Sequence, residues 1–405
     1  MNSYNAYNKK FANGSGSYSA EAISDRAVPV IINALLVSGI LFSSLILPLY
    51  LKNMQTTYAI SWISCIISAT TVFISTKKRF WAIWIIFFMA LIIGMLGSPI
   101  IPAMLFGAIT AVGSGTSLIC SAPKKLAFLP PLLPIGAYGI ALALTRDPAV
   151  SIGALILLLP MIAMGYTSRA DTSRTVSVGI CAIVESALLI GGVAIWVYVA
   201  YGELTLSSLS AASEYFKGGF VYYSELGMQT LYQAEITPII KKELYASANT
   251  LVNVSIGLAG ACFIVTSFLS HGIHLGISST YGNKNEELKN SKITVSVEAA
   301  LIFVTAYILS FSTNASNMMS LPATAALNIC IILIPCLAYL GFDTLSLLPK
   351  KLGLLGLILW GGVIMMIVAS SSSFLFVFAL IGSAYVIIRN VDAWAKDFYS
   401  KGDKK

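Results

Sequence analysis

The chain has 405 residues, of which 57% are hydrophobic and only 10% are charged, and its mean hydropathy is +0.83. Because a soluble protein of this size carries about a quarter charged residues, the composition excludes a soluble globular protein. It predicts an all-α, polytopic transmembrane helix bundle. The net charge of +8 does not indicate nucleic-acid binding, since the basic residues gather between apolar runs.

The uncharged runs predict about twelve membrane spans, because each is long enough to cross about 30 Å of hydrocarbon. A polar tail of residues 1–27 precedes them, and a charged tail of residues 391–405 follows. Spans 1–7 fill residues 28–201, and spans 8–12 fill residues 249–390. Their approximate ranges are 28–50, 57–75, 80–97, 101–120, 126–144, 149–167, 175–201, 249–270, 293–312, 321–341, 352–370 and 373–388. The connections at 98–99 and 370–373 are very short. The two spans that either connection joins could instead form a re-entrant or tilted hairpin.

The basic residues predict the orientation of these spans. If both termini are inside, all but five of the 25 basic residues fall on the inner side, as the positive-inside rule requires. The five expected outside are Lys52, Arg146, Lys217, Lys241 and Lys242. This bias explains the basic character of the chain as topology and favours some attraction to anionic lipid.

Residues 202–248 form the one long connection, expected on the outer side. It is rich in aromatic residues whose spacing suits an amphipathic helix broken at Gly218–Gly219. The aromatic residues are Tyr215, Phe216, Phe220, Tyr222 and Tyr223. The simpler interpretation is a segment resting at the headgroup level. The alternative is a lid or partner-docking loop, since long loops are often functional.

Residues 244–283 contain no Asp, Glu, Lys or Arg. A single helix of that length would extend ~60 Å, about twice the hydrocarbon thickness. We therefore expect it either to project from the membrane or to bend near Gly272 or Gly276.

Glu185 is the first candidate site residue, because it lies in the middle of the seventh span. A charged carboxyl there costs several kcal/mol, so it is expected to be protonated, paired or facing water. The functional interpretation is a proton-coupling or substrate-binding group. The alternative is a neutral carboxyl that hydrogen-bonds across helices, with Ser186, Asn253 and Asn328 as candidate neighbours.

The other candidates have simpler explanations. Glu298, near the inner end of the ninth span, is expected to reach the interface or pair with Lys292. His271 and His274 are one turn apart and could supply two metal ligands, but we expect two exposed interfacial rings. Asn253 and Asn328 resemble interhelical hydrogen-bonding residues. Small residues predict close helix packing in "GAYGIALA" from Gly136, in "GLAGA" from Gly257, at Gly191–Gly192 and at Gly361–Gly362.

Motifs of enzymes and cofactor sites are missing from the sequence. It contains no GxxxxGK[ST] phosphate loop, no HExxH and no GxSxG. The six cysteines lack metal-ligand spacing. No cofactor and no metal is expected, and nothing names an enzyme.

The C-terminal part resembles the YybS-like family of predicted bacterial membrane proteins. The resemblance rests on "ANTLVNVSIGLAGACFIVTSFLSHGIHL" from Ala248, "LNICIILIPCLAYLGFDTLSLL" from Leu327 and "FALIGSAYVIIRNVDAW" from Phe378. In the last element Arg389 precedes Asp392, whereas the family places the acid first. The family has been likened to the substrate-binding membrane subunits of energy-coupling-factor vitamin transporters. The resemblance therefore implies a bacterial cell-membrane location and a separate ATPase as a partner.

These observations lead to three hypotheses of function. The first is a bacterial integral membrane protein that binds or transports a small solute. The second is a non-transporting scaffold in envelope assembly or sporulation that docks partners through residues 202–248. The third is a membrane-embedded transferase for lipid-linked sugars. It would need outward-facing catalytic acids or Arg clusters, and only Arg146–Asp147 in a short loop comes near.

Overall fold

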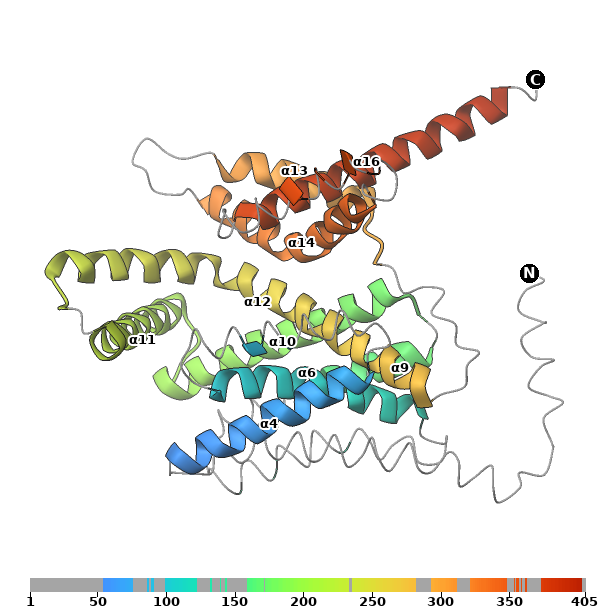
Figure 1. Ribbon diagram of the computed structural model, residues 1–405. Coiled ribbons are helices and arrows are strands. Elements are labelled where there is room, and N and C mark those ends of the chain that lie inside the picture. The colour runs from blue at the N-terminus through green and yellow to red at the C-terminus, as the bar shows by residue number, and fades with distance from the viewer. Residues whose placement is uncertain are drawn as a thin grey trace, which may run out of the picture. The chain divides into compact units, whose positions relative to one another are not determined.

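The described part of the chain is all-helical in the computed structural model (Figure 1). The structure describes residues 54–75, 99–121, 159–170, 172–232, 235–281, 293–311, 321–347 and 373–402, with a few single positions between them. Its helices are α4 (Met54–Ser75), α6 (Ile100–Ser121), α9 (Pro160–Arg169), α10 (Arg174–Tyr201), α11 (Leu206–Tyr232), α12 (Pro238–Tyr281), α13 (Val297–Ser310), α14 (Leu321–Ser346) and α16 (Ser373–Gly402). They belong to two compact units, one of residues 1–133 and 273–286, the other of residues 134–272 and 287–405.

In the first unit, α4 and α6 pack through stripes of buried hydroxyl groups. The stripe on α4 consists of Ser61, Ser64, Ser68 and Thr71, and that on α6 includes Thr110, Ser114 and Ser117. Thr110 lies 3.4 Å from Ser68, and the Cys65 thiol lies 3.8 Å from the carbonyl of Pro99. A later residue of α4 thus contacts a later residue of the segment that contains α6, which means that α4 and α6 run in the same direction.

In the second unit, α9 and α10 form an antiparallel hairpin. Thr167 and Ser177 hydroxyls lie 2.7 Å apart near the turn, and the Cys181 thiol donates to the Pro160 carbonyl over 3.6 Å. Ser173 caps α10, because its hydroxyl accepts from the backbone N–H of Val176. At the other end of α10, Gly202 adopts the left-handed conformation (φ 77°) that ends many helices.

Helix α12 runs antiparallel to α10 and parallel to α14. Gly257, Gly260 and Phe268 of α12 meet Asn328, Ile332 and Tyr339 of α14, in that order. Gly257 and Gly260 lie in the "GLAGA" stretch, so its prediction as a packing signal is confirmed. The helix continues unbroken through Gly272 and Gly276, and Figure 1 shows it changing direction along its length.

Helices α13, α14 and α16 enclose the largest hydrophobic cluster of the described residues, with Phe303, Leu337 and Ala379 fully buried. The thiol of Cys330 on α14 donates to the Phe303 carbonyl on α13 over 3.7 Å. Helices α14 and α16 approach most closely at Gly341 and Gly382. A Cβ at Gly341 would overlap the carbonyl oxygen of Phe378, and one at Gly382 would overlap that of Leu337.

Among the described residues, four helices are long and apolar enough to cross a membrane: Arg174–Tyr201, Pro238–Ile277, Leu321–Ser346 and Leu375–Trp394. Three shorter apolar helices fall within other expected spans, at Tyr58–Phe73, Leu105–Cys120 and Val297–Ser310. The expected spans 28–50, 80–97, 126–144 and 352–370 lie outside the described residues, apart from single positions.

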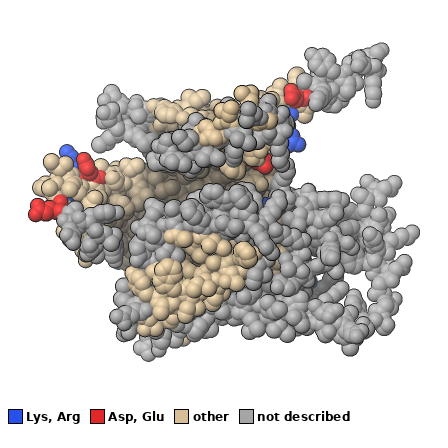
Figure 2. Space-filling model, in the orientation of Figure 1, with Lys and Arg blue, Asp and Glu red and all other residues tan. Residues whose placement is uncertain are grey.

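Large apolar side chains such as Ile183, Ile190 and Ile256 are about 70% exposed, as lipid-facing residues would be. Figure 2 accordingly shows few charged atoms on the described surface. The protein is therefore a candidate multi-pass membrane protein.

The segment 202–248 is mostly helical and contains α11 and the start of α12. The expected break at Gly218–Gly219 is wrong, because α11 continues through both glycines. A Cβ added at either glycine would have no described atom within 4 Å. Helix propensity costs about 1 kcal/mol per glycine, which the rest of this 27-residue helix outweighs. An ion pair of 3.2 Å between Lys241 and Glu225 joins the start of α12 to α11.

Candidate functional site

Glu185 belongs to the buried face of α10. The buried residues of that helix around it are Ser177, Val178, Cys181 and Ala182, which recur at helical spacing with Glu185. The carboxyl side chain is only 6% exposed. It lies eleven positions beyond Arg174, or ~16 Å along the helix. The pattern of the sequence thus places an acid inside the helix packing, in the central third of a candidate span.

The carboxylate of Glu185 contacts α12 through Thr266. The Thr266 hydroxyl donates to Oε2 of Glu185 over 3.4 Å and also lies 3.1 Å from the carbonyl of Phe263. A threonine hydroxyl has one proton to donate, so the carboxylate shares a long, weak hydrogen bond. Among the described residues no Lys, Arg or His forms an ion pair with Glu185. The site therefore has acceptor capacity that the described side chains leave unused.

Arg174 is the basic residue at the start of the same helix, and it contacts Phe268 of α12. Its guanidinium carbon lies 4.0 Å from the ring centroid of Phe268, and Nη2 donates to the Phe268 carbonyl over 3.4 Å. The Phe268 ring in turn lies 5.3 Å from the ring of Tyr339 on α14. Arg174 thus joins the start of α10 to α12 by cation–π and hydrogen-bond contacts, and Phe268 in turn packs on α14.

Asn328 contacts one turn of α12 at two points. Its Oδ1 accepts from the backbone N–H of Gly257 over 2.6 Å, and its Nδ2 donates to the carbonyl of Asn253 over 2.8 Å. Nδ2 also lies 2.9 Å from the carbonyl of Thr324 in its own helix. The interhelical role expected for Asn328 is confirmed, whereas Asn253 takes part through its backbone.

The expected hydrogen bonds of Glu185 to Ser186, Asn253 and Asn328 are wrong. The Ser186 hydroxyl donates to the carbonyl of Ala182, the two asparagines bond between α12 and α14, and the described partner of Glu185 is Thr266.

His271 and His274 are each only 5% exposed, so the expectation of two exposed interfacial rings is wrong. In the first unit, Nδ1 of His274 lies 2.9 Å from the hydroxyl of Ser117, and that hydroxyl also reaches the His274 carbonyl over 3.4 Å. Packing against α6 explains the burial of His274, which sequence spacing alone does not reveal. Within the described ranges, no group of three His, Cys, Asp or Glu side chains is arranged to hold a metal ion.

Glu298 and three of the aromatic candidates on α11 are on the surface. Glu298 is exposed in the first turn of α13, where a negative charge favours the helix N-terminus behind the Ser296 cap. Tyr215, Phe220 and Tyr222 are exposed on α11, and Tyr223 lies on the same helix. Tyr215 and Phe216 pack on Trp196 of α10, with ring centroids 5.7 and 5.4 Å away. These rings join α11 to the end of a candidate span, as an interfacial aromatic cluster would.

Sequence reasoning missed the buried and partly buried hydroxyl residues of α12, one of which contacts Glu185. Thr266 holds the carboxyl, and Ser267 and Ser270 are each 1% exposed. The hydroxyl of Ser267 has no hydrogen-bond partner among the described groups. The signal was present in the sequence, because hydroxyl residues at 266, 267 and 270 recur at helical spacing in an otherwise apolar run.

Comparisons with protein-family models, curated proteins and solved structures find no match to this chain.

Proposed function

We propose that this protein is a twelve-span membrane protein that binds and transports a small cationic solute or a proton at Glu185. The observation that carries the proposal is the buried carboxyl between α10 and α12, whose hydrogen bond among the described residues is the one of 3.4 Å from Thr266. Ionisable groups inside a membrane protein are costly, and they commonly mark ion or substrate paths.

The chemistry of the site favours an exchangeable positive charge. A carboxylate without a paired cation is unfavourable in an apolar interior, so it takes up either a proton or a cation. The hydroxyl of Thr266 adds a neutral oxygen atom on the facing helix, which suits both a hydrated cation and a proton relay. A permanent internal ion pair would instead have fixed the charge.

The directions of the described helices support twelve alternating spans. Helices α9, α12, α14 and α16 run one way in the second unit, and α10 and α13 run the other way. Twelve spans in series require this arrangement, because α9, α12, α14 and α16 would be even-numbered and α10 and α13 odd-numbered. In the first unit, α4 and α6 would be the second and fourth spans, and they run in the same direction.

The rival hypotheses have less support. A scaffold that docks partners through residues 202–248 needs no acid inside the membrane. A transferase would need outward polar groups, and Arg146–Asp147 lies outside the described residues. The resemblance to the YybS-like family and the implied ATPase partner remain predictions.

The test is proton and cation flux in proteoliposomes with a trapped pH-sensitive dye and an imposed potassium-diffusion potential. We expect flux with the wild-type protein and its loss in Glu185→Gln, because the amide keeps hydrogen-bonding capacity but cannot carry a charge. Glu185→Asp should retain part of the flux. Glu243→Gln is the matched control, because Glu243 is an exposed acid on α12.

Normal flux in a folded Glu185→Gln variant would show that the carboxyl is only a hydrogen-bonding group in the helix packing. Size-exclusion chromatography in detergent establishes folding for each variant before reconstitution.

A further inference from the structure

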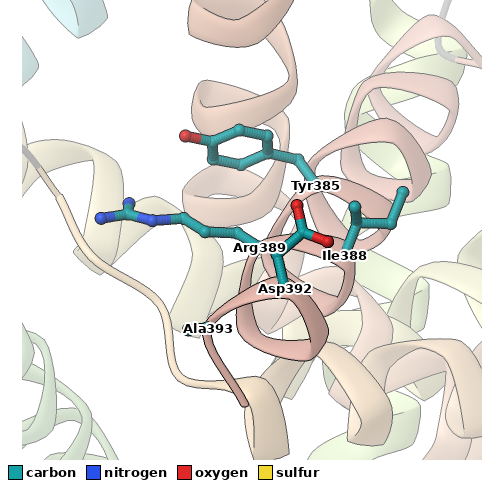
Figure 3. A pocket seen from close by; sticks show the side chains of 5 residues that line it. All are labelled: Tyr385, Ile388, Arg389, Asp392 and Ala393. Atoms are coloured by element: carbon teal, nitrogen blue, oxygen red, sulfur yellow. The ribbon is translucent and has the colours of Figure 1, made fainter. Parts of the chain in front are cut away.

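The last turns of the candidate span in α16 carry two adjoining cavities. The first, of about 440 Å³, is lined by Tyr385, Ile388, Arg389, Asp392 and Ala393 (Figure 3). The second, of about 360 Å³, shares Tyr385, Arg389 and Ala393 and extends to α14 and the segment before α13. Both lie within the second unit, away from Glu185 along the chain and outside the function proposed for it.

The charged groups of the first cavity are separate from each other. Figure 3 shows the Arg389 guanidinium and the Tyr385 hydroxyl projecting to one side, while the carboxylate of Asp392 points elsewhere. Within the described ranges, neither Arg389 nor Asp392 forms an ion pair. A cation and an anion are therefore both accessible from one cavity, at different positions.

The second cavity combines polar and apolar walls. Thr294 and Asn390 lie beside Arg389, and the apolar residues of the lining are Ile293, Val295, Leu340 and Val386. A polar rim next to apolar side chains matches the boundary between a lipid headgroup and its acyl chains. The position also fits, because residues 385–393 end the candidate span Leu375–Trp394, and Trp is enriched at this depth of a membrane.

We propose that these cavities bind a headgroup that carries a phosphate and an amine, as in phosphatidylethanolamine. The phosphate contacts Arg389 and Tyr385, because guanidinium groups bind phosphate oxygens through charge-assisted hydrogen bonds. The ammonium group contacts Asp392. A purely anionic headgroup such as phosphatidylglycerol satisfies Arg389 but meets the carboxylate of Asp392 without a compensating charge. The site therefore selects a zwitterion.

The experiment is native mass spectrometry of the full-length protein in detergent, titrated with an equimolar mixture of phosphatidylethanolamine and phosphatidylglycerol. We expect the wild type to retain phosphatidylethanolamine preferentially. Arg389→Gln should weaken retention of both lipids about fivefold, the size of one exposed charge contact. Arg389→Lys should restore part of it. Asp392→Asn should abolish the preference by weakening phosphatidylethanolamine and strengthening phosphatidylglycerol.

Lys242→Gln and Glu243→Gln are matched controls, since both residues are exposed near the start of α12, do not line either cavity and should leave retention unchanged. Free phosphoethanolamine tests whether the cavities bind a free headgroup or require a whole lipid. If it displaces bound lipid at millimolar concentration, the headgroup alone is sufficient, and if it does not, the acyl chains contribute. Unchanged retention in Arg389→Gln, or an unchanged preference in Asp392→Asn, would overturn the proposal.

Discussion

The Asn328 side chain bonds to both partners of one helical hydrogen bond in α12. In an α-helix the N–H of Gly257 would bond to the carbonyl of Asn253, four residues earlier. The amide of Asn328 reaches both groups, at 2.6 and 2.8 Å. Side chains that enter this ladder are a recognised cause of helix bending. Glycine is required at 257, because a Cβ there would lie 2.9 Å from the Cα of Asn328.

This geometry predicts that Asn328→Asp is more harmful than Asn328→Leu. With leucine, Gly257 and Asn253 can bond to each other within α12, so we expect a loss of only about 1 kcal/mol. Aspartate sets an acceptor against the carbonyl of Asn253, which should cost about 1–3 kcal/mol. Thermal unfolding of both variants in the same detergent gives the comparison. A leucine variant that is the less stable of the two would contradict the proposed contact.

At the residue scale, the sequence predicted which polar side chains lie within the helix packing better than it predicted which groups they contact. An acid or amide in an apolar run is visible from composition, so Glu185 and Asn328 were identifiable. Their partners depend on the rotation of neighbouring helices about their axes, which hydropathy does not specify. Thr266 and the buried position of His274 follow from that rotation and became clear only in the structure.

Among the helices, the closest approach at a glycine is between α14 and α16. Gly341 and Gly382 face each other, and each leaves no space for a Cβ against the carbonyl oxygen of the other helix. Small residues permit such contact between backbones in membrane helices, where van der Waals packing replaces the hydrophobic effect. The hydrophobic cluster around Leu337 and Ala379 depends on this spacing.

We therefore expect Gly341→Ala and Gly382→Ala each to destabilise the protein by about 1–3 kcal/mol, the usual cost of overpacking. Gly191→Ala is the matched control. It lies within α10 with no atom within 4 Å of a Cβ position, so alanine should be neutral or stabilise the helix by up to about 1 kcal/mol. Thermal unfolding midpoints in detergent distinguish the two classes. Equal midpoints for all three variants would mean that α14 and α16 are not in close contact.

Helix existence was more predictable than helix contacts. Long uncharged runs correctly indicated α10, α12, α14 and α16, because the hydrocarbon thickness sets a minimum length that few other structures share. Small residues were a weaker guide. The "GLAGA" stretch does pack against α14, whereas Gly139, Gly191, Gly361 and Gly362 have no atom of the described residues within 4 Å of a Cβ position. A glycine also occurs where the chain only tolerates it, so its presence does not identify a partner.

For the chain as a whole, the order of helix directions constrains the part between α14 and α16. Helix α13 runs antiparallel to both, since Tyr307 meets Phe376 at 5.9 Å and the segment before α13 lines a cavity with Leu340 and Val386. Helices α14 and α16 consequently run in the same direction. If both cross the membrane, the chain between them has to return across it, which residues 352–370 are apolar enough to do.

This argument predicts the accessibility of three single cysteines in a cysteine-free background. Cysteines at Leu321 and Ser373, the first residues of α14 and α16, should react with a membrane-impermeant maleimide added to intact cells. A cysteine at Lys350 should react only after the membrane is opened, because parallel helices begin on the same side and Lys350 follows the end of α14. Ser210→Cys on α11 is a positive control for the outer side. If Ser373→Cys and Lys350→Cys share the same protection, residues 352–370 form a re-entrant hairpin and the chain has fewer than twelve spans.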